Sequence, residues 1–179
     1  MLAELHGDNP TRSGLILIYS TGLVGTLAIV IFALLQEIDL SIWQWIALII
    51  VAADVIAGAV ANMTKSTNRY YREKSMRVSW GFLAVHIFHP ALLAFTGLAL
   101  WQDMLILYFY TSISGVIVLS QSEQNYQKPL AAGLVMTGIV LNSLIFQPEP
   151  LIAWFAPVYM FKLIAAFSVT HYPQPEQES

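Results

Sequence analysis

The chain has 179 residues, of which 57% are hydrophobic and only 11% are charged, and its formal net charge is −3. Soluble domains carry about 25% charged residues, so this composition excludes an ordinary water-soluble protein. The small net charge gives no reason to expect a nucleic-acid partner, and the lack of cysteine excludes disulfides, thiolate metal sites and cysteine nucleophiles. The sequence therefore predicts an all-α integral membrane protein.

The chain begins with a polar, acidic stretch, MLAELHGDNPTRSG. This stretch lacks the charged start and the small-residue cleavage site of a signal peptide, so we expect the first apolar run to be kept as a membrane span. A helix needs about 20 apolar residues to cross the hydrocarbon core. About six runs of that length occur in the chain: 14–35, 42–63, 78–99, 101–120, 129–147 and 150–170.

These runs predict a single bundle of about six transmembrane helices within residues 1–170. The remaining residues, 171–179, are polar and rich in proline, and we expect them to form a disordered cytoplasmic tail. Two runs contain proline, which has no N–H to donate to the carbonyl four residues earlier. The sequence therefore predicts kinks at Pro90 and Pro157.

Basic residues predict the orientation of the bundle. Most lysines and arginines lie in the loop between the second and third runs, at Lys65, Arg69, Arg72, Lys74 and Arg77. Loops rich in Lys and Arg stay in the cytoplasm. We therefore predict a multi-pass protein of the cell (inner) membrane with both termini cytoplasmic.

Asp54, His86, His89 and Lys162 are ionisable side chains inside apolar runs. A charge at the bilayer centre costs roughly 2.5–3.5 kcal/mol, and such residues usually pair with each other or mark a functional site. At 1.5 Å per residue, Asp54, His86 and Lys162 all lie about 12–13 Å from the cytoplasmic end of their runs. The spacing predicts a polar intramembrane site in the cytoplasmic half, with Asp54 and Lys162 facing each other.

The second run also carries a stripe of small and polar residues. Asp54, Gly58 and Asn62 share one helix face, and Gly58 leaves room for a close helix or a ligand. A purely structural interpretation stays open, in which small residues around Gly58 form a helix-packing seam and Asp54 is merely tied to Lys162.

The histidine pair allows three interpretations. His86 and His89 are three residues apart and lie on one helix face. They are hydrogen-bonded core residues, proton carriers beside Asp54, or metal ligands together with Asp54. Because the apolar runs contain no third histidine, the metal interpretation is weak, and no metal is assigned.

The basic loop interleaves Arg69 and Arg72 with Tyr70 and Tyr71. Ordinary anchoring at the membrane interface explains this composition. The more specific hypothesis is an anionic-headgroup site at the cytoplasmic mouth of the polar site.

Two functions are compatible with these residues. The favoured one is a protein that binds or modifies an amphipathic, lipid-like molecule, and anionic molecules are among the candidates. Asp54 and His86 would then be acid/base or ligand groups, His89 a supporting partner and Lys162 an electrostatic stabiliser. The residues expected to contact the ligand are Gly58, Asn62, Arg69, Tyr70, Tyr71, Arg72 and Tyr19.

The alternative is a proton-coupled carrier or channel that uses Asp54, His86 and His89 as a relay. Transporters commonly contain internal repeats and bind their cargo at the bilayer midplane, whereas no repeat is evident here. In a homodimer the two chains would supply the repeat that a single chain lacks, so a homodimer stays open. The sequence does not decide whether the protein is an enzyme or which cofactor it would use. The expected partners are membrane lipid and the amphipathic ligand.

Overall fold

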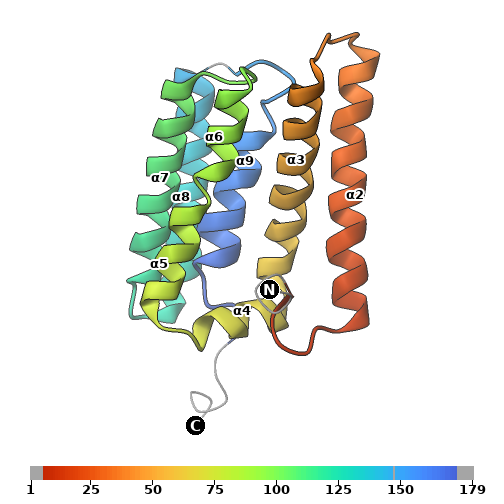
Figure 1. Cartoon of the computed structure of the whole chain (residues 1–179). Coiled ribbons are helices and arrows are strands. Elements are labelled where there is room, and N and C mark those ends of the chain that lie inside the picture. The colour runs from red at the N-terminus through yellow and green to blue at the C-terminus, as the bar shows by residue number, and fades with distance from the viewer. Residues whose placement is uncertain (1–5, 147, 173–179) are drawn as a thin grey trace.

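The computed structural model describes residues 6–146 and 148–172, and the elements in these ranges are all helices (Figure 1). The long helices are α2 (Arg12–Leu35), α3 (Ile42–Met63), α7 (Trp101–Leu119) and α8 (Gln124–Ile145). The shorter ones are α4 (Lys65–Arg72), α5 (Met76–Val85), α6 (Phe88–Phe95), α9 (Phe155–Met160) and the π-helix η1 (Phe161–Phe167). Most of the predicted tail, 171–179, lies outside the described residues.

Five helical segments are long and apolar enough to cross a membrane: α2, α3, α5 with α6, α7 and α8. They correspond to the first five predicted spans. The prediction of an all-α protein with membrane-spanning helices is confirmed at this level.

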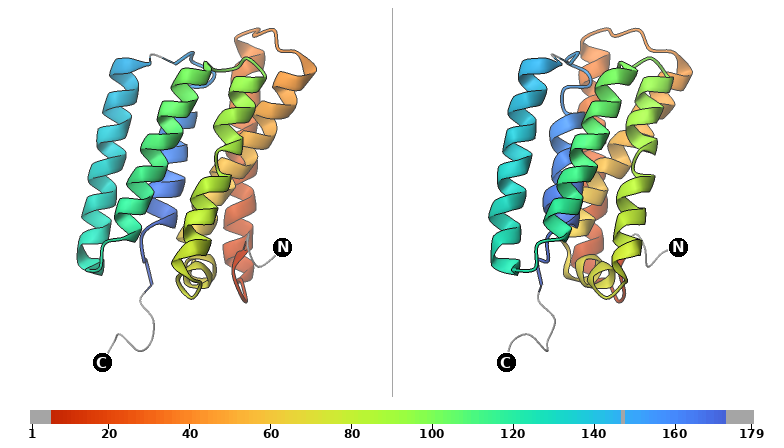
Figure 2. Two further views of the ribbon diagram at one scale, coloured as in Figure 1. Left: turned by 60° about the vertical axis from the view of Figure 1, so that its left-hand side comes forward. Right: turned by 90° about the vertical axis from the view of Figure 1, so that its left-hand side faces the viewer.

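The helix ends follow from local sequence signals. The turn before α3 closes with a capping box, in which the Ser41 hydroxyl accepts from the Gln44 backbone and the Gln44 side chain accepts from the Ser41 N–H. The turn between α6 and α7 contains Gly97 at φ +76°, a conformation that glycine adopts without steric cost. These signals keep the connections short, so that consecutive membrane-length segments run antiparallel (Figure 2).

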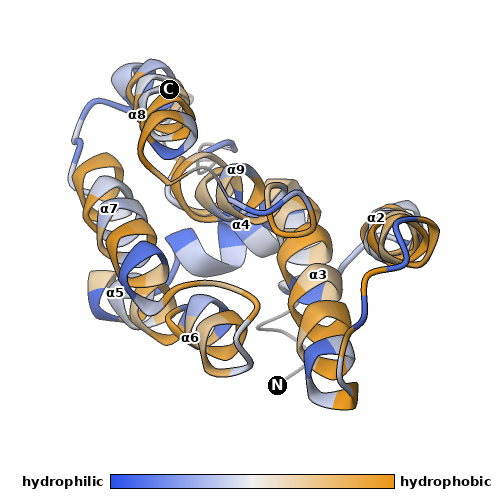
Figure 3. Cartoon of the chain, turned by 90° about the horizontal axis from the view of Figure 1, so that it is seen from above, coloured by the Kyte–Doolittle hydropathy of each residue, from blue (hydrophilic) through white to orange (hydrophobic). Residues whose placement is uncertain are grey.

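The segment predicted as the sixth span is shorter than a membrane-crossing helix. Helices α9 and η1 contribute six and seven residues, which at 1.5 Å per residue make about 20 Å, short of the roughly 30 Å hydrocarbon core. They pack against α3, α7 and α8 inside the bundle (Figure 3). Phe155, Tyr159 and Leu163 are fully buried there. Other helices thus enclose this segment, and a sixth span is not confirmed.

The two predicted proline kinks are not confirmed either. Pro90 is the third residue of α6 and Pro157 the third residue of α9. In the first turn of a helix the backbone N–H has no partner within the helix, so proline costs little there. The interruption lies just before α6, because α5 ends at Val85 and α6 starts at Phe88.

Helix α2 lies at the edge of the bundle and packs on α3 (Figure 3). A Cβ added at Gly22 would lie 2.9 Å from the Ala57 Cβ, so the two helices approach closely because both residues are small. The small-residue seam considered from the sequence thus exists, and it joins α3 to α2.

The start of α2, helix α4 and the segment after η1 lie at the same end of the bundle (Figure 1). Polar side chains bind this last segment. Asn68 Nδ2 donates to the Val169 carbonyl and Asn68 Oδ1 accepts from the His171 N–H, both at 2.9 Å. Gln127 Oε1 accepts from the Thr170 N–H at 2.9 Å. These bonds satisfy backbone groups that the end of a helix leaves unpaired.

We expect Asn68→Ala to lower the free energy of unfolding by about 1–3 kcal/mol, because it leaves one buried and one partly buried backbone group without partners. Denaturant unfolding in mixed micelles measures this change. The matched control is Asn142→Ala, whose side chain makes no hydrogen bond to the described residues and should change stability by less than about 0.5 kcal/mol. Equal effects of the two variants would contradict the anchoring role.

Candidate functional site

Asp54 and Lys162 form an ion pair between α3 and η1. Lys162 Nζ lies 2.6 Å from Asp54 Oδ2 and also donates to the Asp54 backbone carbonyl at 3.2 Å. The lysine is 2% exposed, so its ammonium depends on these two acceptors. The prediction that these two residues face each other is confirmed.

Gly58 makes this ion pair sterically possible. A Cβ at Gly58 would lie 2.6 Å from Lys162 Cε and 2.7 Å from Nζ. Any side chain there would overlap the path that the lysine takes to Asp54. The space that the sequence predicted above Asp54 is therefore occupied by the lysine side chain of the same chain.

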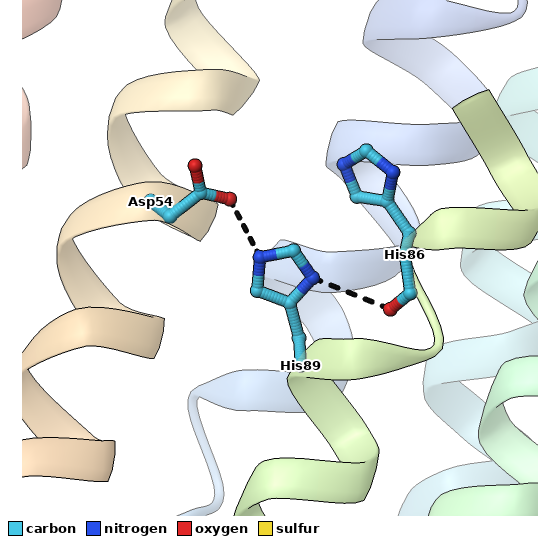
Figure 4. Close-up of side chains that lie close together, drawn as sticks. All are labelled: Asp54, His86 and His89. Atoms are coloured by element: carbon cyan, nitrogen blue, oxygen red, sulfur yellow. Dashed lines mark hydrogen bonds and ion pairs between the residues drawn. The ribbon is translucent and has the colours of Figure 1, made fainter.

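His89 is the histidine that contacts Asp54. Its Nε2 lies 2.6 Å from Asp54 Oδ2, and its Nδ1 lies 3.3 Å from the His86 carbonyl oxygen (Figure 4). Asp54 Oδ2 thus receives both Lys162 and His89. The residue expected to be a supporting partner contacts the carboxylate directly.

His86 has a different environment. Its Nδ1 lies 2.6 Å from the Phe82 carbonyl oxygen. A carbonyl only accepts, so Nδ1 carries the hydrogen, and Nε2 of the neutral ring is an acceptor. One atom from each of His86, His89 and Asp54 lies within 4.8 Å of the other two.

Tyr159 explains how the break before Pro90 is tolerated. Pro90 cannot donate to the His86 carbonyl, and the hydroxyl of Tyr159 donates to that carbonyl at 2.9 Å instead. Tyr159 is fully buried in α9. Sequence reasoning did not assign Tyr159 to the site, although the carbonyl freed by Pro90 was a signal that other groups would donate to it.

A cavity of about 630 Å³ lies beside these groups, which we call the α3–α5 cavity. Helix α3 packs against α6 but makes few contacts with α5, and the cavity lies between α3 and α5. Asp54, His86, His89 and Lys162 form its polar inner end. The remaining lining residues are Gly58, Ala61 and Asn62 of α3, Tyr70 and Tyr71 of α4, and Val78, Gly81, Phe82 and Val85 of α5.

Four predicted ligand contacts, Gly58, Asn62, Tyr70 and Tyr71, line the α3–α5 cavity. Asn62 also donates from Nδ2 to the Lys162 carbonyl at 3.3 Å, which helps to hold η1 against α3. Tyr19 lies elsewhere: its hydroxyl is 2.7 Å from His6 Nε2, and it lines a separate cavity of about 480 Å³ between α2 and α3.

The two arginines predicted to bind a headgroup do not line the α3–α5 cavity. Arg72 Nη2 donates to the Phe167 carbonyl at 2.9 Å, and its guanidinium lies 5.3 Å from the centre of the Phe167 ring. Burial lowers the pKa of Arg72 to about 10, so the side chain stays charged at neutral pH. Arg69 lines a smaller cavity, of about 290 Å³, with Thr64 and Lys65. Headgroup binding by either arginine stays a prediction.

The Asp54, His86 and His89 group has ligand types that zinc and other transition metals accept. Lys162 nevertheless places a positive charge 2.6 Å from the same carboxylate and already balances it. This arrangement favours a site organised by hydrogen bonds over a metal centre.

No model of a known protein family matches the chain, and neither the curated proteins nor the solved structures contain a significant match.

Proposed function

We propose that this protein binds an amphipathic, lipid-like molecule in the α3–α5 cavity, with the polar part of the molecule beside Asp54 and His86. The observation that carries the proposal is a cavity with apolar walls that ends at an ionisable cluster. Its volume, about 630 Å³, lies within the roughly 300–1,000 Å³ range of small-molecule sites. An apolar chain would pack against α5, and a polar group would replace water at the inner end.

The same cluster suits acid–base chemistry on the bound molecule. His86 Nε2 is an acceptor lining the cavity, and His89 is held between Asp54 and the His86 carbonyl. A base oriented by a hydrogen bond to its second ring nitrogen is a common arrangement in catalytic sites. This geometry supports a proton-transfer step on the bound ligand.

We further infer that the end of the bundle with α4 faces the cytoplasm of the cell (inner) membrane. Lys65, Arg69 and Arg72 lie in α4, and Lys74 and Arg77 follow it, which supports a cytoplasmic position. The start of α2 and the segment after η1 lie at this end, so both termini would be cytoplasmic. The ligand would then enter from the cytoplasmic leaflet.

Filling the cavity tests the proposal. Gly81 lines the cavity, and a Cβ there meets no atom within 4 Å. We expect Gly81→Leu to leave folding intact and to reduce the lipid that copurifies with the protein at least about tenfold, because the new side chain occupies the apolar part of the site. Mass spectrometry of the extracted protein measures the bound lipid.

The control is Gly133→Leu. Gly133 is also an exposed helical glycine whose Cβ would meet nothing within 4 Å, and it lies on α8, away from the cavity. Bound lipid should be unchanged in this variant. Loss of lipid in both variants, or in neither, would contradict ligand binding in the α3–α5 cavity.

One observation favours a second function, a proton-coupled carrier. Asp54 lines both the α3–α5 cavity and the cavity between α2 and α3, so one carboxylate contacts two spaces. A carrier would show proton flux in liposomes that Asp54→Asn abolishes. Flux without any lipid bound in the α3–α5 cavity would favour the carrier over the lipid-binding protein.

A further inference from the structure

The inner end of the α3–α5 cavity presents two atoms that the fold leaves without a hydrogen-bond partner. Lys162 and His89 both bind Oδ2 of Asp54, and no donor among residues 6–146 and 148–172 reaches Oδ1. The Asp54 side chain is 44% exposed. The second atom is His86 Nε2, whose ring donates through Nδ1 to Phe82. Both of these atoms are acceptors.

Each donor group at this end of the cavity already binds an acceptor of the protein. The Lys162 ammonium binds the Asp54 carboxylate and the Asp54 backbone carbonyl, at 2.6 and 3.2 Å. The Asn62 amide donates to the Lys162 carbonyl, and the Tyr159 hydroxyl donates to the His86 carbonyl. The atoms without a partner among the described residues are acceptors, so a ligand group that donates would complete this end of the cavity.

Charge narrows the choice of donor. A phosphate or carboxylate would lie against the Asp54 carboxylate, and the Lys162 ammonium that could attract it is already bound to that carboxylate. An ammonium group or a metal ion would lie beside the Lys162 ammonium, which already neutralises Asp54. Either would add a charge beside Asp54 and Lys162, which already balance each other.

We infer that the polar group bound at the inner end of the cavity is a neutral hydroxyl, which donates to Asp54 Oδ1 or His86 Nε2. The ligand is then a long-chain or polycyclic alcohol rather than an anionic lipid. This inference rests on the proposed function and specifies its ligand. It also changes the expectation from the sequence, in which the basic residues suggested an anionic headgroup.

A competition among three probes of equal chain length tests the inference. Purified full-length protein in micelles is incubated with equal concentrations of 1-hexadecanol, hexadecyl phosphate and hexadecylamine, and the bound probes are quantified by mass spectrometry. We expect the alcohol to be enriched about tenfold or more over each charged probe. Enrichment of the phosphate or of the amine would overturn the hydroxyl assignment and leave lipid binding in the cavity standing.

Two variants separate the two proposals. Gly81→Leu should abolish uptake of all three probes, and uptake that this variant does not change would place the probes outside the cavity and overturn both. His86→Phe keeps a ring of similar shape and removes the acceptor, so alcohol binding should weaken about twofold to tenfold. If His86→Phe does not fold, the ranking of the probes on the unmodified protein still decides.

A metal measurement completes the test. Zn²⁺ alone is titrated into the protein, and we expect no stoichiometric binding, because Lys162 holds the charge of Asp54. Binding of one Zn²⁺ per chain that His89→Phe removes would show that the acceptors serve a metal and would overturn the hydroxyl assignment.

Discussion

Replacing Lys162 with methionine is expected to lower the free energy of unfolding by about 1–3 kcal/mol, because the Asp54 carboxylate that loses its partner is 44% exposed. Methionine keeps most of the volume of the lysine side chain, so the change removes chiefly the ammonium. Asp54 would then keep only His89 as a partner for Oδ2. Thermal or denaturant unfolding of the purified protein in micelles measures the loss.

The double variant Asp54→Asn with Lys162→Met shows whether the loss belongs to the pair. The asparagine removes the charge that the missing ammonium left uncompensated, so the double variant should be more stable than the sum of the two single changes predicts. Strict additivity of the two changes would mean that the residues do not interact in the folded protein.

The common level of the polar residues along the bundle could be predicted from the sequence. Counting residues from the ends of the apolar runs placed Asp54, His86 and Lys162 at one level, and the structure brings the lysine to 2.6 Å from Asp54. The count works because each helix advances about 1.5 Å per residue, so small errors in the helix ends shift the level only slightly.

The assignment of contacts could not be predicted in the same way. Each residue turns a helix by about 100°, so an interruption changes which side chain faces a neighbour. The gap between α5 and α6 lies at His86 and Ile87, and it is His89, beyond the gap, that contacts Asp54. A sequence pattern analysed as one continuous helix does not show which of the two histidines faces Asp54.

The sixth apolar run shows the other limit of the sequence. Burial in lipid and burial inside a protein select the same residues, so hydropathy does not distinguish a lipid-exposed span from an enclosed helix. Run length was the available signal, and it counted Leu151 and Ile152, which are buried but precede α9. The enclosed helix carries Lys162 and Tyr159 to the centre of the bundle, so the segment whose span is not confirmed is the one that builds the site.

A single methyl group at Gly58 is expected to disrupt the site. In Gly58→Ala the new Cβ would lie 2.6 Å from Lys162 Cε and 2.7 Å from Nζ, so the lysine has to leave its position beside Asp54. The lysine is buried and has no second carboxylate in reach among the described residues. We therefore expect a loss of about 1–3 kcal/mol in the free energy of unfolding, typical of overpacking.

The control for Gly58→Ala is Gly133→Ala, because a Cβ at Gly133 meets nothing within 4 Å. Alanine there should raise stability by about 0.4–1 kcal/mol, since it restricts the unfolded chain without a clash. In a Lys162→Ala background the atoms that Gly58→Ala would strike are absent. Gly58→Ala should then become neutral or stabilising, like Gly133→Ala. A loss of the same size in both backgrounds would show that Gly58 serves helix packing and that the lysine does not depend on it.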